Sequence, residues 1–106
     1  MITYDDFKKL ELVVAEVLEV ERVEGSEKLL KLKVNIGKEE RQIIAGIGKE
    51  YEPEFMVGKK IVVIANLEPR QLMGLESQGM LLAADNEGKP VFLMPEKDAP
   101  AGSPVK

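Results

Sequence analysis

Residues 59–84 read KKIVVIANLEPRQLMGLESQGMLLAA, and this stretch contains the strongest structural signals of the chain. An apolar, β-branched run over 61–65 has the length of a buried strand, and a second apolar run follows at 80–84. The segment between the runs contains two glycines and Pro69, which cannot donate a hydrogen bond to a sheet ladder. We therefore predict a loop held between two strands, a common place for binding residues.

A half-buried hairpin is predicted before this stretch. Apolar residues at 30, 32, 34 and 36 alternate with Lys31, Lys33 and Asn35, which predicts a strand with two lysines side by side on its outer face. Residues 37–40 have the composition of a turn, and 41–45 read as the returning strand. Arg41 is therefore expected on the strand next to the two lysines.

The flanking segments predict one more long strand and several short elements. Residues 12–23 form a valine-rich strand candidate, and before it Thr3 and Asp6 have the spacing of a capping box at a helix start. We expect Phe7 and Leu10 to anchor that short helix to the body of the protein. Residues 49–57 allow at most one short helix. Residues 85–88 predict a hairpin turn, 90–94 a short strand and 95–106 an extended tail.

Five main strands without strand–helix–strand alternation predict an all-β fold. The strand count and lengths favour a five-stranded Greek-key barrel of the oligonucleotide/oligosaccharide-binding (OB) type, with short helices and a C-terminal extension. We expect Phe55 and Val57 to plug one end of this barrel. A chain of 106 residues suits a single domain, with the extension over about residues 86–106.

The composition argues against an enzyme. Histidine, cysteine and tryptophan are all absent, which removes most nucleophile–base systems and nearly all zinc sites. Glutamates at 16, 19 and 21 could form a carboxylate-only metal or acid–base cluster, but a solvated strand face is the favoured interpretation. Gly46-Ile47-Gly48 lacks the third glycine of a dinucleotide-binding fingerprint. We expect no catalytic residue, no cofactor and no metal.

Location and charge give further expectations. The chain contains no apolar run of membrane-spanning length, no signal peptide and no cysteine, so we expect a cytoplasmic protein. The net charge of −4 argues against a simple electrostatic nucleic-acid binder. The charge is uneven, however: residues 28–74 hold nine basic and six acidic residues, a net charge of +3. A local basic patch can bind phosphate because distant exposed charges are screened within about 10 Å.

Two short sequence motifs within residues 59–84 are similar to those of a known family. Asn-Leu-Glu-Pro-Arg at 66–70 and Gly-Leu-Glu-Ser-Gln-Gly-Met-Leu-Leu-Ala-Ala at 74–84 resemble the signature of the tRNA-binding domain found at the C-terminus of methionyl-tRNA synthetases, as their beta subunit and as a free-standing tRNA-binding protein. The chain departs from the pattern at 24–25, where many members have His-Pro, and at Met73, where many have arginine.

This resemblance implies a module that recognises the outer corner of tRNA by shape, without catalysis of its own, and that forms a homodimer built partly from the C-terminal extension. A methionyl-tRNA synthetase catalytic subunit is a further implied partner. A protein-binding or chaperone-like dimer is the alternative, because one branch of the family resembles export chaperones. The residues that we expect to bind RNA are Lys28, Lys31, Lys33, Arg41, Asn66, Arg70, Ser77 and Met80.

Overall fold

The computed structural model describes all residues of the chain, 1–106, and its regular structure consists mainly of β-strands. The helices are α1 (Tyr4–Phe7) and α2 (Pro53–Met56). The strands are β1 (Leu12–Arg22), β2 (Leu30–Asn35), β3 (Glu40–Ala45), β4 (Lys60–Ile64), β5 (Arg70–Leu72), β6 (Leu75–Ser77), β7 (Met80–Leu81), β8 (Ala83–Asn86) and β9 (Lys89–Phe92). Each helix has four residues, and neither could span a membrane.

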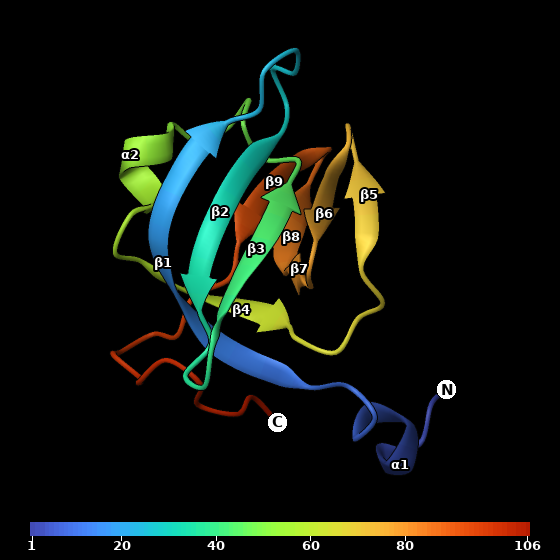
Figure 1. Ribbon diagram of the computed structural model, residues 1–106. Helices are drawn as coiled ribbons and strands as arrows, with labels where there is room; N and C mark the ends of the chain where they lie inside the picture. Colours follow the sequence, from blue (N-terminus) through green and yellow to red (C-terminus); the bar gives the residue numbers. More distant parts are fainter.

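One antiparallel sheet with the order β3-β2-β1-β4-β7 forms the body of the molecule (Figure 1). The long strand β1 pairs with β4 through its first half and with β2 through its second half, and a bulge between Val17 and Glu19 lies where the partners change. A bulge increases local twist, so β1 can coil around the core and curl the sheet. The expected all-β, five-stranded barrel is confirmed.

The barrel interior follows from the alternation in the sequence. In β2 the apolar side chains at 30, 32 and 34 are buried, whereas Lys31 and Lys33 point away from the core. The buried cluster also draws side chains from β1, β3, β4 and β7. At one end Met56 is fully buried, whereas Phe55 is 54% exposed. The expectation that Phe55 and Val57 plug the barrel is therefore wrong. In a four-residue helix no periodicity indicates which side faces inward.

The N-terminal helix stands off from the barrel (Figure 1). The predicted capping box is confirmed, since Thr3 Oγ1 accepts from Asp6 N and Asp6 Oδ2 accepts from Thr3 N. The expected anchoring is not found: α1 buries no residue, and Leu10 is exposed. The helix is stabilised by its cap and not by packing on the core.

The C-terminal tail runs back along the first strand and lies beneath it in Figure 1. Its backbone bonds to β1 at three points: Gly102 N to Val14 O at 2.7 Å, Val14 N to Ser103 O at 2.9 Å and Val105 N to Leu12 O at 2.8 Å. The tail thus satisfies the edge of β1 that β2 leaves unpaired. The segment is ordered although its composition alone does not indicate it.

Candidate nucleic-acid interface

The signature segment between β4 and β7 is not a simple loop, because it contains the β5–β6 hairpin. Leu72 pairs with Leu75, so the turn consists of Met73 and Gly74 at φ 49° and 79°. Two successive residues with positive φ are typical of a tight hairpin turn whose twist matches the strands. Methionine is an unusual residue there, so the sequence gives little sign of the turn. The hairpin stands beside β3 in Figure 1.

Ser77 and Gln78 join this segment to the barrel. The Ser77 hydroxyl accepts from Ile44 N at 3.0 Å and donates to Gly79 O at 2.9 Å, and the residue is only 3% exposed. Gln78 N donates to Gln42 O at 2.8 Å, and Gln42 N donates to Gln78 Oε1 at 3.0 Å. These bonds connect β3 to the signature segment and complete the barrel along a seam of Ile44, Gln42, Ser77 and Gln78.

Arg41 holds the base of the same segment. Its Nη1 donates to Ala65 O at 2.9 Å and to Gln78 O at 3.2 Å, and its Nε lies 2.8 Å from Glu39 Oε2. This hydrogen bond and the charge of Arg41 hold the pKa of the Glu39 carboxyl below its ordinary value. The Arg41 side chain is only 20% exposed. The structure therefore gives Arg41 a position beneath the signature segment and not on the open strand face.

Asn66 ties the start of the signature segment to the N-terminal region. Its Oδ1 accepts from Glu11 N at 2.8 Å and its Nδ2 donates to Lys9 O at 2.7 Å. Both bonds cross more than fifty positions of sequence, so no local pattern could have predicted them. Asn66, Arg41 and Ser77 are thus all engaged within the protein, and their direct contacts to RNA remain a prediction.

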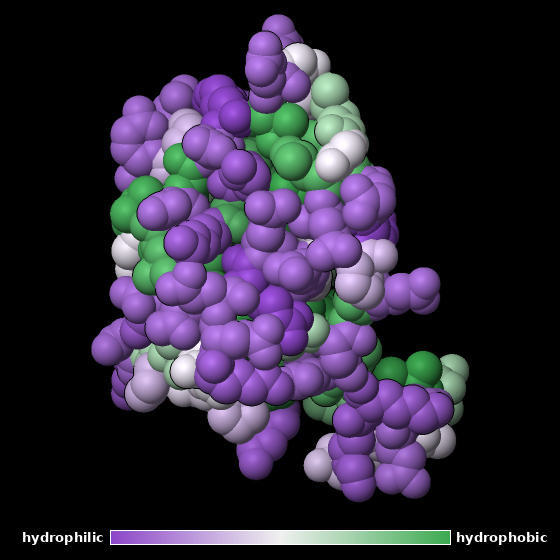
Figure 2. Space-filling view, viewed as in Figure 1, coloured by the Kyte–Doolittle hydropathy of each residue, from purple (hydrophilic) through white to green (hydrophobic).

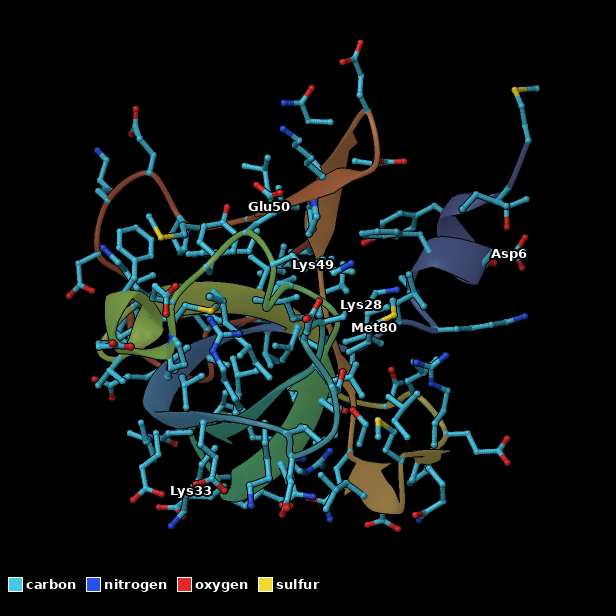
Figure 3. The ribbon with its side chains drawn as sticks, turned by 90° about the horizontal axis from the view of Figure 1, so that it is seen from above. Asp6, Lys28, Lys33, Lys49, Glu50 and Met80 are labelled. Atoms are coloured by element: carbon cyan, nitrogen blue, oxygen red, sulfur yellow. The ribbon has the colours of Figure 1, made fainter.

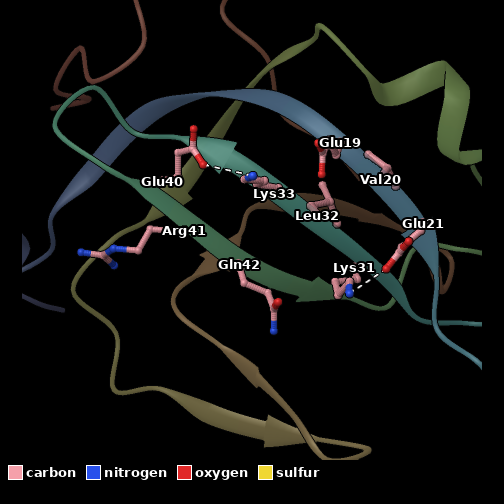
Figure 4. Close-up of a pocket in the computed structure, with 9 residues that line it drawn as sticks. All are labelled: Glu19, Val20, Glu21, Lys31, Leu32, Lys33, Glu40, Arg41 and Gln42. Atoms are coloured by element: carbon pink, nitrogen blue, oxygen red, sulfur yellow. Dashed lines mark ion pairs between the residues drawn. The ribbon is translucent and has the colours of Figure 1, made fainter.

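The two lysines on the outer face of β2 are paired with glutamates. Lys31 Nζ lies 2.6 Å from Glu21 Oε1, and Lys33 Nζ lies 3.3 Å from Glu40 Oε1 (Figure 4). Both lysines line an open groove of about 390 Å³ across β1, β2 and β3, together with Glu19. Figure 2 shows that hydrophilic side chains cover most of this face. The face is polar, but its positive charge is largely compensated.

Three of the expected RNA-binding residues have side chains that make no hydrogen bond or ion pair within the protein. Lys28 and Arg70 are exposed and have no carboxylate within 4.0 Å. Met80 is 39% exposed at the start of β7, next to the buried seam. A cation, a guanidinium and an apolar thioether can contact phosphate, sugar and base respectively. These three residues can meet a ligand without first breaking an ion pair.

The structure contains no group of three or more histidine, cysteine or acidic side chains arranged to hold a metal ion. Of the glutamates of β1, Glu21 pairs with Lys31.

The fold and this surface define a small OB-like barrel with a fixed hairpin and exposed cationic and apolar side chains beside it. Residues 12–104 match the family model described as "Putative tRNA binding domain", and the chain belongs to this family. The family resemblance is thereby confirmed, and the chain is a tRNA-binding domain related to the C-terminal region of methionine–tRNA ligases.

Curated relatives show where such a domain occurs. The chain is 59% identical over 104 residues to the methionine–tRNA ligase of Caldanaerobacter subterraneus subsp. tengcongensis and 56% identical over 106 residues to that of Methanothrix thermoacetophila. These matches cover 98% and 100% of the chain but only 16% of each relative. The chain therefore spans about a sixth of the length of these ligases.

Solved structures share the fold over the whole chain. A protein related to methionyl-tRNA synthetase from Pyrococcus horikoshii superposes with a TM-score of 0.95 at 37% identity, covering 100% of this chain and 98% of the other. The chaperone CsaA from Bacillus anthracis superposes with a TM-score of 0.91 at 28% identity, covering 100% of this chain and 99% of the other. Both superpositions therefore extend beyond the barrel to the N-terminal helix and the C-terminal tail.

Proposed function

We propose that this chain recognises tRNA by the shape of its outer corner and uses the signature hairpin and the adjacent loops as the contact surface. Support comes from family membership and from one observation: polar side chains of the signature fix its segment to the barrel, while Arg70 and Met80 remain exposed on it. A preorganised loop loses little conformational freedom on binding, so even a few contacts can give useful affinity.

The expected contact residues fall into three groups within this proposal. Lys28, Arg70 and Met80 contact RNA directly. Lys31 and Lys33 exchange their glutamate partners for phosphates of the RNA, which lowers their net contribution because the ion pairs must first be broken. Arg41, Asn66 and Ser77 act by holding the signature segment in place.

We further propose that the domain works as the appended domain or beta subunit of a methionyl-tRNA synthetase. There it would increase tRNA capture and leave the chemistry to the catalytic part. Tethering converts the second binding event into an intramolecular one, so a weak module can raise the affinity of the whole assembly. Its location in this proposal is the cytoplasm, as one barrel domain with an extension over about 86–106.

A homodimer is the second part of the proposal. Ile2, Tyr4 and Leu10 are exposed around α1, and apolar side chains of α1 and the tail line an open groove of about 450 Å³. Hydrophobic residues are visible at this N-terminal segment in Figure 2. Exposed apolar surface of this kind is typical of an interaction site. A second copy would cover it and would place two barrels on one tRNA.

Light scattering tests the dimer. Deletion of 95–106 should yield monomers, and Leu10→Glu, which leaves the tail bonds to β1 intact, should do the same. Lys97→Glu, a charge change on an exposed tail residue away from this groove, is the control and should leave the mass unaltered. A dimer of unaltered mass for both test variants would contradict the proposed interface.

Binding to whole tRNA, titrated with salt, tests the main function, with single-stranded and duplex RNA as controls. We expect salt-dependent binding to tRNA and weaker binding to both controls, because the module reads shape and phosphates together. Equal affinity for all three RNAs would contradict shape recognition. No binding to tRNA at low salt by the folded protein would contradict the function itself.

The outer face of β1, β2 and β3, where the lysines are paired with glutamates, favours one alternative, a protein-binding or chaperone-like role. Its groove holds both charges in close pairs, and two solved neighbours are named as chaperones. Mixed charges can pair with the backbone and side chains of an extended peptide. Binding of a reduced, unfolded polypeptide, competed by peptide and not by tRNA, would favour this alternative.

A further inference from the structure

Two lysines in the loops at one end of the barrel differ from most other basic residues of the protein. Eight of the fifteen basic residues have a carboxylate within 4.0 Å. Lys28, in the loop between β1 and β2, and Lys49, in the loop between β3 and α2, are exposed and have none. Lys49 lies outside the signature motifs and was not among the residues expected to bind RNA.

The topology brings these two lysines to one niche. Lys28 and Lys49 line a depression of about 250 Å³ with Gly46, Glu50 and Gly88, so three separate connections meet there. Figure 3 shows Lys28, Lys49 and Glu50 following one another at the loop end of the barrel. Two ammonium groups and one carboxylate give the niche a net charge of +1. One phosphodiester, with its single negative charge, would neutralise it.

Gly46 determines the course of the Lys28 side chain. A Cβ added to Gly46 would come within 2.7 Å of Lys28 Cε, so the absence of a side chain at 46 lets the lysine stem lie across the end of β3. The backbone below is fixed as well, because Gly48 N donates to Lys28 O at 2.6 Å. A lysine held along its stem loses less conformational entropy when its ammonium group binds a ligand.

We propose that Lys28 and Lys49 together bind one phosphate of the RNA backbone, with Gly46 positioning Lys28. The site rests on the proposed function and adds to it a phosphate position at the loops between β1 and β2 and between β3 and α2. Lysine binds phosphate as a point charge, so two lysines from different loops can approach the same group from two sides. The hairpin and this niche would then contact the RNA from two directions.

The test measures tRNA affinity of the full chain across a salt series for Lys28→Met, Lys49→Met and the double variant. Methionine keeps the apolar stem and removes the charge. Each single variant should weaken binding roughly fivefold to tenfold and lower the salt slope by about one ion. The double variant should lower the slope by little more than either single variant, because both lysines serve the same phosphate. A salt slope that falls by about two ions in the double variant would overturn the shared site.

Lys97→Met is the matched control. It makes the same charge change at an exposed, unpaired lysine of the tail, and it should leave the slope unaltered. If the wild-type protein binds tRNA and Lys49→Met has the same affinity and salt slope as this control, the phosphate site is overturned and the main function stands. Wild-type protein that does not bind tRNA would overturn both.

Gly46→Ala tests the positioning separately. Its backbone φ is not positive, and the closest atom belongs to a flexible side chain, so alanine should displace Lys28 without unfolding the protein. We expect the affinity to fall as in Lys28→Met and no further loss when both changes are combined. Circular dichroism checks the fold. Full tRNA affinity in folded Gly46→Ala would exclude the positioning role, and Lys49→Met remains an independent test of the site.

Discussion

Replacement of Ser77 by alanine distinguishes a residue that holds the signature segment from one that contacts RNA. In the structure the hydroxyl is bonded to Ile44 N at 3.0 Å and to Gly79 O at 2.9 Å, and all three residues are buried. Ser77→Ala therefore leaves one donor and one acceptor without a partner. Each unsatisfied buried group costs about 1–3 kcal/mol, so the free energy of unfolding should fall by roughly 2–6 kcal/mol.

Such a loss is a large part of the 5–15 kcal/mol that is typical for a domain. Urea denaturation measures it, with both proteins at one concentration because a dimer makes stability concentration-dependent. With an m value of about 2 kcal/mol per molar, the midpoint should fall by roughly 1–3 M while m stays constant. Ser103→Ala is the matched control, because its hydroxyl donates to Pro100 O at 2.6 Å in an exposed setting, where water can replace it. It should cost less than about 1 kcal/mol.

The salt slope of tRNA binding completes this experiment. Serine carries no charge, and in this structure its hydroxyl is engaged, so the slope should not change in Ser77→Ala. Stability equal to that of Ser103→Ala together with a clear loss of tRNA affinity would refute the reasoning. Ser77 would then act at the RNA and not at the barrel seam.

Three further changes test other parts of the structure. Arg70→Ala should weaken tRNA binding and lower its salt slope by about one ion, because Arg70 is exposed and unpaired; an unaltered slope would remove it from the contact surface. Met56→Ala should cost about 2–5 kcal/mol in denaturation because Met56 is fully buried. Phe55→Ala on the same helix should cost about 1–2 kcal/mol, because the half-exposed ring gives up only its contacts with Tyr51, Phe92 and Lys59; equal losses would contradict the assignment of the inward side. Glu39→Gln should lower thermal stability near neutral pH only. The folded pKa of Glu39 is lowered, so its stabilising contribution is present above the ordinary pKa of 4.5 and disappears as the pH falls through the lowered value. A difference between Glu39→Gln and the parent protein that persists well below that pKa would argue against the ion pair with Arg41 as its cause.

The sequence predicts the barrel well where one pattern has one physical solution. The strict alternation over 30–36 predicts a strand with its apolar face on the core. In the structure β2 lies there, with its apolar side chains buried and Lys31 and Lys33 on the outer face. The boundaries of the long first strand also agree closely. Residues 80–84 were expected as one strand, but the structure divides them between β7 and β8, where β8 leaves the main sheet and pairs with β9.

The roles of the signature residues were less predictable because their partners are distant in sequence. Ser77 bonds to Ile44 across 33 positions and Asn66 bonds to Glu11 across 55. A sequence shows polar residues in a loop, but it does not show that their hydrogen bonds are used inside the protein. Lys49 illustrates the opposite case, since nothing near it in sequence marks it and only the fold brings it to Lys28.

The seam of the barrel also bears on the motion of the molecule. Elsewhere strands are joined by regular ladders of backbone bonds, but β3 meets the signature segment through side chains of Gln42, Ser77 and Gln78 together with one backbone bond. A junction with few backbone bonds opens at a lower free energy than a central ladder. Amide hydrogen exchange at Ile44, whose N–H donates to a hydroxyl, should therefore be faster than at the core of β1. A ligand bound to the signature hairpin would slow this exchange. The exchange rate of the Ile44 amide would therefore report whether the hairpin surface is occupied.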